Sequence, residues 1–80
     1  MRASNLQSSL ISRVVHDEEQ STLRICFRNG GAYVYFDVPG SEYEALKTAP
    51  SPGQHYNRSI RGRYRCLYDP GRRRFRPDAA

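Results

Sequence analysis

The sequence contains no long apolar segment. Residues 1–15 hold no apolar run of signal-peptide length, and no stretch approaches the roughly 20 apolar residues that span a membrane. We therefore expect a cytoplasmic protein without a membrane partner.

Cysteine and histidine are also scarce. The two cysteines, Cys26 and Cys66, could form at most one disulfide, and two free thiols are expected in a reducing compartment. Neither they nor His16 and His55 show the paired CxxC or HxxxH spacing of a zinc site. No local motif combines a nucleophile with a base. We therefore expect a protein that is not an enzyme and that has no catalytic residue, metal or cofactor.

Lysine is nearly absent, because 12 of the 13 basic residues are arginine. Residues 58–80 hold eight of these arginines and two acidic residues, whereas residues 1–57 hold five basic and six acidic residues. Arginine favours phosphate and carboxylate partners through planar, bidentate contacts that lysine cannot make. The charge of the C-terminal third thus indicates an anionic partner.

The length of 80 residues predicts a single domain and excludes a large multidomain enzyme. At this size about 60–65% of the surface of the unfolded chain is buried on folding, which leaves little room for an enclosed cavity. Any site is therefore expected on the surface.

Three segments show the branched, aromatic or alternating composition of strands: residues 8–15, 22–28 and 32–38. Asn29, Gly30 and Gly31 lie between the second and third segments and predict a tight hairpin.

The length of this hairpin loop decides which face Tyr33 and Tyr35 occupy. A two-residue loop sets both tyrosines on the face of Arg24 and Arg28, where they would form a stacking platform beside arginine. A three-residue loop over residues 29–31, with a glycine in the left-handed conformation, brings both tyrosines onto the core face. The strand pattern leaves both registers open.

Two helices are expected after the third strand. Ser41 begins a capping box that Glu44 closes, and Pro50 ends the helix that follows. Ser51 begins a second helix, with Pro52 at its first helical position. The expected fold class is α+β, with a three-stranded antiparallel β-meander packed against two short helices.

An ordered set of motifs covers residues 8–64: SSLI, LRICF, GGAYVYFDVP, EYEAL, SPGQHYN and IRGRY. The set resembles the KTSC domain, a small bacterial module that is also found at the C-terminus of some lysyl-tRNA synthetases. The residues that carry the resemblance are Ser9, Ile11, Leu23, Phe27, Gly30, Tyr33, Tyr35, Val38, Pro39, Tyr43, Leu46, Ser51, Gly53, Tyr56, Asn57, Ile60 and Arg61.

The resemblance implies a small bacterial protein for which RNA binding is the usual suggestion. The middle residue of the YxY motif is often polar in the family, which favours the core-facing register. Residues 1–7 are expected to form a flexible N-terminus, residues 8–68 a KTSC-like domain, and residues 69–80 a basic disordered tail.

The candidate nucleic-acid-binding residues are arginines and tyrosines, because cations replace the counterions of phosphates and planar rings stack on unpaired bases. The alternative interpretation is a solvated helix face whose tyrosines pack on the sheet. The candidates are Arg58, Arg61, Arg63, Tyr64, Arg65, Arg72, Arg73, Arg74, Arg76, Tyr33 and Tyr35.

The sequence thus predicts a non-catalytic nucleic-acid-binding module, with RNA, either tRNA or another structured RNA, as the expected partner. The alternative is a protein–protein interaction module. In that case the same arginines meet an acidic protein partner, or the sheet edge accepts a strand.

Overall fold

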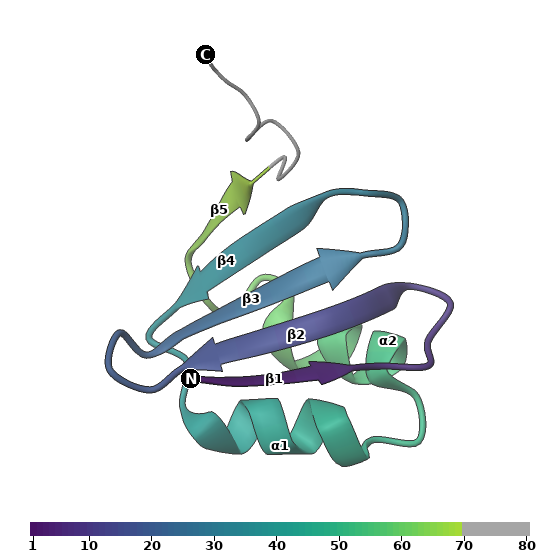
Figure 1. Cartoon of the computed structure of the whole chain (residues 1–80), viewed down its shortest axis with the longest axis horizontal. Coiled ribbons are helices and arrows are strands. Elements are labelled where there is room, and N and C mark those ends of the chain that lie inside the picture. Colours follow the sequence, from purple (N-terminus) through teal and green to yellow (C-terminus); the bar gives the residue numbers. More distant parts are fainter. Residues whose placement is uncertain (70–80) are drawn as a thin grey trace.

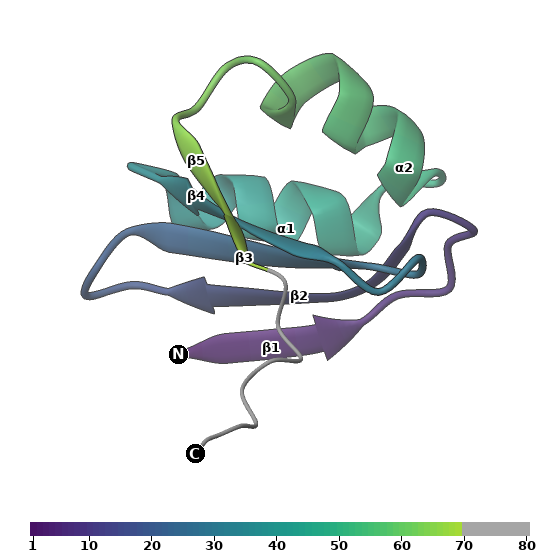
Figure 2. The same ribbon diagram turned by 90° about the horizontal axis from the view of Figure 1, so that it is seen from above.

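Five strands form one antiparallel sheet in the order β1-β2-β3-β4-β5, and the helices cover one of its faces (Figure 1). Figure 2 shows α1 and α2 together on the same side of the strands. The computed structural model describes residues 1–69. In chain order the elements are β1 (Arg2–Asn5), β2 (Ile11–Asp17), β3 (Thr22–Phe27), β4 (Ala32–Phe36), α1 (Gly40–Thr48), α2 (Pro52–His55), the π-helical turn η1 (Tyr56–Ile60) and β5 (Cys66–Asp69).

The α+β class is confirmed, but the expectation of three strands is wrong, because β1 and β5 add a strand at each edge. β1 lies in the segment for which we expect flexibility, and all four of its residues pair with β2. β5 pairs with β4 and includes Asp69, which we expect in the tail. The rest of the expected tail, residues 70–80, lies outside the described residues. Both edge strands have only four residues, too few for alternation to reveal them, and distant partners hold them in place.

The hairpin between β3 and β4 adopts the register that puts the tyrosines on the helix-covered face. Leu23 lies opposite Tyr35 and Ile25 lies opposite Tyr33. The loop has three residues, as in the second alternative, but it occupies residues 28–30, one residue earlier than expected, because the Phe27 amide donates to the Gly31 carbonyl at 2.8 Å.

Gly30 is the residue that permits this turn. It has a φ of 104°, a backbone conformation that residues other than glycine rarely adopt. Its amide donates to the Phe27 carbonyl at 3.0 Å and closes the loop. The length of the loop and the position of Gly30 in it therefore fix which residues of β3 and β4 share a face of the sheet.

The two helices begin differently from each other. α1 starts at Gly40 with Pro39 as its N-cap and without a side-chain cap, so the capping box expected at Ser41 does not form. Ser41 lies within the first turn and cannot cap it. At α2 the expected cap is present, since the Ser51 hydroxyl accepts from the Gln54 amide at 3.4 Å.

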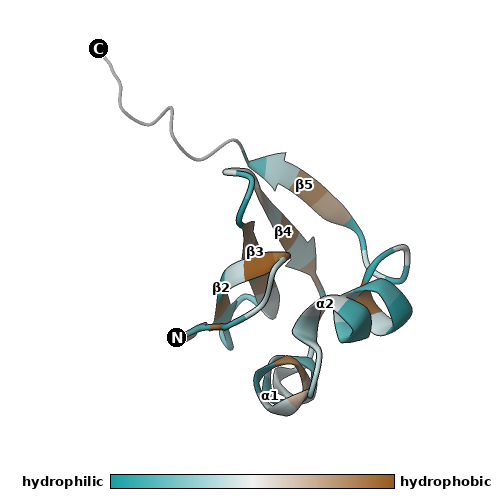
Figure 3. Ribbon diagram, turned by 90° about the vertical axis from the view of Figure 1, so that its right-hand side faces the viewer, coloured by the Kyte–Doolittle hydropathy of each residue, from teal (hydrophilic) through white to brown (hydrophobic). Residues whose placement is uncertain are grey.

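The core lies between the sheet and the helices, and Figure 3 shows apolar residues along β3 and β4. Its buried members are Leu6, Ile11, Val14, Leu23, Ile25, Tyr35, Val38, Tyr43, Leu46, Tyr56 and Ile60. His16 is the polar side chain buried with them, and its Nε2 donates to the Val38 carbonyl at 2.8 Å, which ties β2 to the start of α1. No helix among residues 1–69 is long and apolar enough to cross a membrane.

Candidate functional site

Four of the candidate arginines lie on η1 and on the connection from η1 to β5. Arg58 is on η1, and Arg61, Arg63 and Arg65 follow it. All four are exposed, and none forms an ion pair with another residue of the described part of the chain. The guanidinium of Arg65 lies 5.6 Å from the ring centre of Phe36. These side chains carry positive charge that the fold does not neutralise.

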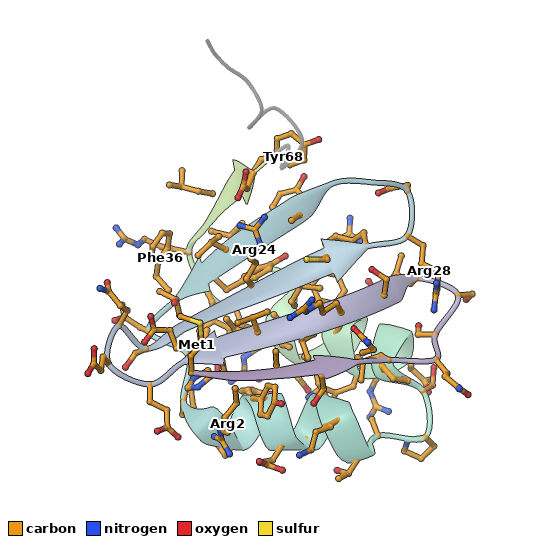
Figure 4. All side chains as sticks on the ribbon, viewed as in Figure 1. Met1, Arg2, Arg24, Arg28, Phe36 and Tyr68 are labelled. Carbon is orange, nitrogen blue, oxygen red and sulfur yellow. The ribbon has the colours of Figure 1, made fainter. Side chains whose placement is uncertain are left out.

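Three arginines from the first half of the chain are used differently. Arg2 bonds the carboxylate of Glu44 at 2.7 Å, and Arg24 is paired with Asp69 across the sheet. Arg28 donates to backbone carbonyls of the loop between β1 and β2, one of them that of Leu6 at 3.1 Å. Figure 4 shows Arg2, Arg24 and Arg28 spread over separate parts of the sheet. They hold elements together and form no common patch.

A groove of about 870 Å³ opens where the β3–β4 turn, β5 and η1 meet. Its lining includes four aromatic rings, two side-chain amides and one guanidinium, and no acidic side chain. The residues that matter for its chemistry are Phe27, Tyr33, Tyr56, Asn57, Arg61 and Tyr68. All except Tyr68 are among the residues that carry the KTSC resemblance.

The aromatic rings of the groove pack edge to face. Tyr33 and Tyr68 have ring centres 5.1 Å apart at an angle of 60°, and Phe27 and Tyr33 are 5.9 Å apart at 85°. Tyr56 contacts Phe27 at 5.3 Å from the helical side. Edge-to-face packing leaves ring faces that are not covered by another ring. Tyr68 in particular remains 58% exposed at the edge of the sheet.

Gly31 allows Tyr68 to lie against the hairpin turn. A Cβ at this position would lie 3.0 Å from Tyr68 Cε1, which is tighter than most Cβ contacts in proteins, so the ring would have to shift. The ring of Tyr68 therefore packs on backbone, at the same end of the sheet as the hairpin loop (Figure 4).

The two tyrosines predicted in the hairpin have different environments. Tyr33 is half-buried and lines the groove. Tyr35 is 2% exposed, and its hydroxyl forms a hydrogen bond with that of Tyr56 at 2.5 Å. Burial, together with this hydrogen bond, raises the pKa of Tyr35 well above that of a free tyrosine. The prediction that Tyr35 contacts bases is therefore wrong, because the core encloses its ring.

Tyr64, another candidate, is held by Glu42 of α1. Its hydroxyl donates to Glu42 Oε2 at 3.1 Å, while His55 Nε2 lies 3.1 Å from Glu42 Oε1. Burial and the bond to Glu42 raise the pKa of Tyr64. Glu42 thus ties α1 to α2 and to the connection that carries Arg61 and Arg63.

The remaining candidates, Arg72, Arg73, Arg74 and Arg76, lie outside the described residues. The groove adds residues that were not among the candidates: Phe27, Tyr56, Asn57 and Tyr68. Tyr56, Asn57 and Tyr68 belong to the arginine- and tyrosine-rich segment of the sequence, but their place beside Tyr33 follows only from the fold, in which β4 pairs with β5.

Potential metal ligands and thiols are few and scattered in the part of the chain that the structure describes. Within residues 1–69 no group of histidine, cysteine or acidic side chains is arranged to hold a metal ion. Cys26 and Cys66 are free thiols.

The fold and the groove define a small α+β domain that offers an aromatic, positively charged surface groove. The chain belongs to the KTSC domain family, whose family model matches residues 7–64.

A lysine–tRNA ligase of Nostoc punctiforme is 41% identical to this chain over 59 residues, which are 74% of this chain and 10% of the ligase. The chain thus spans about a tenth of the length of that relative. An uncharacterized protein of Stutzerimonas stutzeri is 39% identical over 57 residues, covering 71% of this chain and 80% of that protein. The crystal structure of a KTSC domain protein from Yersinia pestis matches with a TM-score of 0.80 at 28% identity, covering 85% of this chain and 96% of that one.

Proposed function

We propose that this protein is a non-catalytic module that binds RNA through the arginines that follow α2. The observation that carries the proposal is that Arg58, Arg61, Arg63 and Arg65 are exposed and unpaired within the described residues. Phosphates supply the negative charge and the paired acceptor oxygens that planar guanidinium groups bind through two parallel hydrogen bonds.

The relatives favour RNA over other anions as the partner. Part of a lysine–tRNA ligase is similar to most of this chain. A domain that recurs in such a protein is suited to tRNA or to another structured RNA. Binding by exposed arginines is mainly electrostatic, so we expect strong salt dependence and modest sequence specificity.

A protein partner is the second candidate, and the edge strand β5 favours it. Leu67 of β5 is 63% exposed, and the strand has β4 on one side only within the described sheet. An edge strand of this kind can accept a partner strand through backbone hydrogen bonds. Such an interface would respond little to salt, whereas RNA binding would weaken steeply.

Fluorescence anisotropy at two salt concentrations tests the proposal. Labelled tRNA, single-stranded RNA and duplex DNA are titrated with the full chain. A variant with Arg58, Arg61, Arg63 and Arg65 replaced by glutamine should lose about one unit of salt slope for each arginine that contacts phosphate. Arg13→Gln, an exposed arginine of β2, is the matched control and should bind as the native protein does.

A second variant locates the binding more closely. It keeps the full length but carries glutamine at Arg72, Arg73, Arg74 and Arg76. If this variant binds RNA normally, the site lies in the folded domain, as proposed. If it loses all binding, or if the native protein retains no nucleic acid at low salt, the proposal is wrong.

A further inference from the structure

The groove between the hairpin turn, β5 and η1 combines three features that recognise different parts of one ligand. It has an exposed ring in Tyr68, a free amide in Asn57 and a guanidinium in Arg61. We propose that this groove binds one unstacked nucleotide of single-stranded RNA, an inference that rests on the proposed RNA-binding function. The base stacks on Tyr68, the amide of Asn57 bonds the base edge, and Arg61 pairs with the adjacent phosphate.

The stacking surface is Tyr68. Its ring packs edge to face on Tyr33 with 5.1 Å between ring centres, and 58% of the residue stays exposed. An aromatic side chain that is this exposed on an edge strand contributes little to the core. It does offer a flat surface to a nucleobase, which any of the four bases can cover because each has a π-face.

The polar groups of the groove are free to bind. Asn57 is exposed on η1, and no hydrogen bond of its side chain occurs within residues 1–69. An amide both donates and accepts, so it can bond the edge of a base that has left its stack. Arg61 lies four residues further along the chain, lines the same groove, and carries no ion pair in the described structure.

Charge and size favour a nucleotide over other ligands. The lining holds Arg61 and no acidic residue, which favours an anion. An acidic peptide would satisfy Arg61 but would leave the aromatic rings of Tyr33 and Tyr68 without a flat partner. The volume of about 870 Å³ lies within the range of about 300–1,000 Å³ that is usual for small-ligand sites.

The partner is single-stranded where it enters the groove. A base within a duplex has its faces covered by its neighbours and its edge paired, so it offers neither surface to Tyr68 and Asn57. Arg58 lies between the groove residues Asn57 and Arg61 in the chain and Arg63 follows them, and both are exposed, so they add positive charge near the groove without lining it.

The test uses the full chain and two readouts in one titration. A labelled short single-stranded RNA reports affinity by anisotropy, and the amide resonances of Gly30, Gly31 and Asn57 report occupation of the groove by NMR. A perfectly paired RNA hairpin with a minimal loop is titrated in parallel. We expect the single strand to shift the groove amides and the paired stem to leave them unchanged.

Three variants at β5 separate stacking from charge. Tyr68→Leu should weaken binding of the single strand about tenfold or more, and Tyr68→Phe should retain it, because stacking needs the ring and not the hydroxyl. Leu67→Ala is the matched control on the same strand, on the opposite face, and should change the affinity less than twofold. An unchanged amide spectrum outside the groove confirms that each variant is folded.

The outcomes distinguish this inference from the proposed function. If Tyr68→Leu binds RNA as the native protein does and the groove amides stay in place, while the four-arginine variant loses binding, then the groove inference is wrong and RNA binding stands. If the native chain binds neither RNA at low salt, both proposals are wrong. Loss in Tyr68→Leu with rescue in Tyr68→Phe supports the groove.

Discussion

The hydroxyl groups of Tyr35 and Tyr56 form a hydrogen bond of 2.5 Å inside the protein. The bond joins β4 to η1, and Tyr56 presents another part of its ring to the groove. A buried polar contact therefore fixes one wall of the groove relative to the sheet.

Replacing both tyrosines should lower the free energy of unfolding by less than the sum of the two single replacements. Tyr35→Phe or Tyr56→Phe leaves the other buried hydroxyl without its partner, which costs about 1–3 kcal/mol of unfolding free energy. The double variant should be less destabilised than the sum of the two. Urea denaturation of the four proteins measures this coupling, with the exposed Tyr68→Phe as a control near zero. Strict additivity would show that the bond contributes nothing.

Stability should fall at alkaline pH because of Tyr35. Burial raises its pKa above the ordinary value of 10.0, so the folded protein keeps this phenol protonated where the unfolded chain releases the proton. The contribution is fully present below about pH 10 and declines as the pH rises above that value. Tyrosinate absorbance and urea midpoints measured from neutral to alkaline pH test this, and Tyr35→Phe should show a smaller decline. An equal decline in both proteins would contradict the assignment.

Glu42 should matter more than its position on a short helix suggests. Glu42→Gln removes the charge that receives Tyr64 and faces His55, and we expect a loss of about 1–2 kcal/mol in unfolding free energy. Amide exchange at Arg63 should rise as the connection to β5 loosens. Glu19→Gln, at an exposed turn, is the control and should change stability by no more than about 0.5 kcal/mol. Equal amide exchange at Arg63 in both variants would show that Glu42 does not hold the connection to β5 in place.

Gly31→Ala should displace Tyr68 without unfolding the protein. The added Cβ meets the flexible end of an exposed ring, so the ring moves while the sheet remains. We expect altered ring resonances for Tyr68 and Tyr33, weaker binding of single-stranded RNA, and a change in stability below about 1 kcal/mol. Gly53→Ala, whose Cβ would meet Leu10 at the more ordinary distance of 3.4 Å, is the comparison. Unchanged Tyr68 resonances in Gly31→Ala would show that the Tyr68 ring does not lie against residue 31.

Local patterns in the sequence determined the central part of the fold. Alternation at Leu23, Ile25 and Phe27 marked β3, and the glycines after it marked the hairpin, because both depend on neighbours in the chain. The hydroxyl of Ser51 marked the start of α2 for the same reason. The N-cap of α1 was missed by two residues, since Pro39 precedes the helix in place of Ser41 and lacks the side-chain bond that a capping box supplies.

The tertiary structure decided the edges of the sheet and the site. β1 and β5 are short, and their order comes from pairing with β2 and β4 rather than from their own composition. That pairing sets Tyr68 opposite Tyr33, although 34 residues separate them in the chain. Local periodicity carries no information about such a contact. The sequence by itself determined the arginine-rich charge, the central strands and the helix positions, whereas only folding joined Tyr33, Asn57, Arg61 and Tyr68 into one groove.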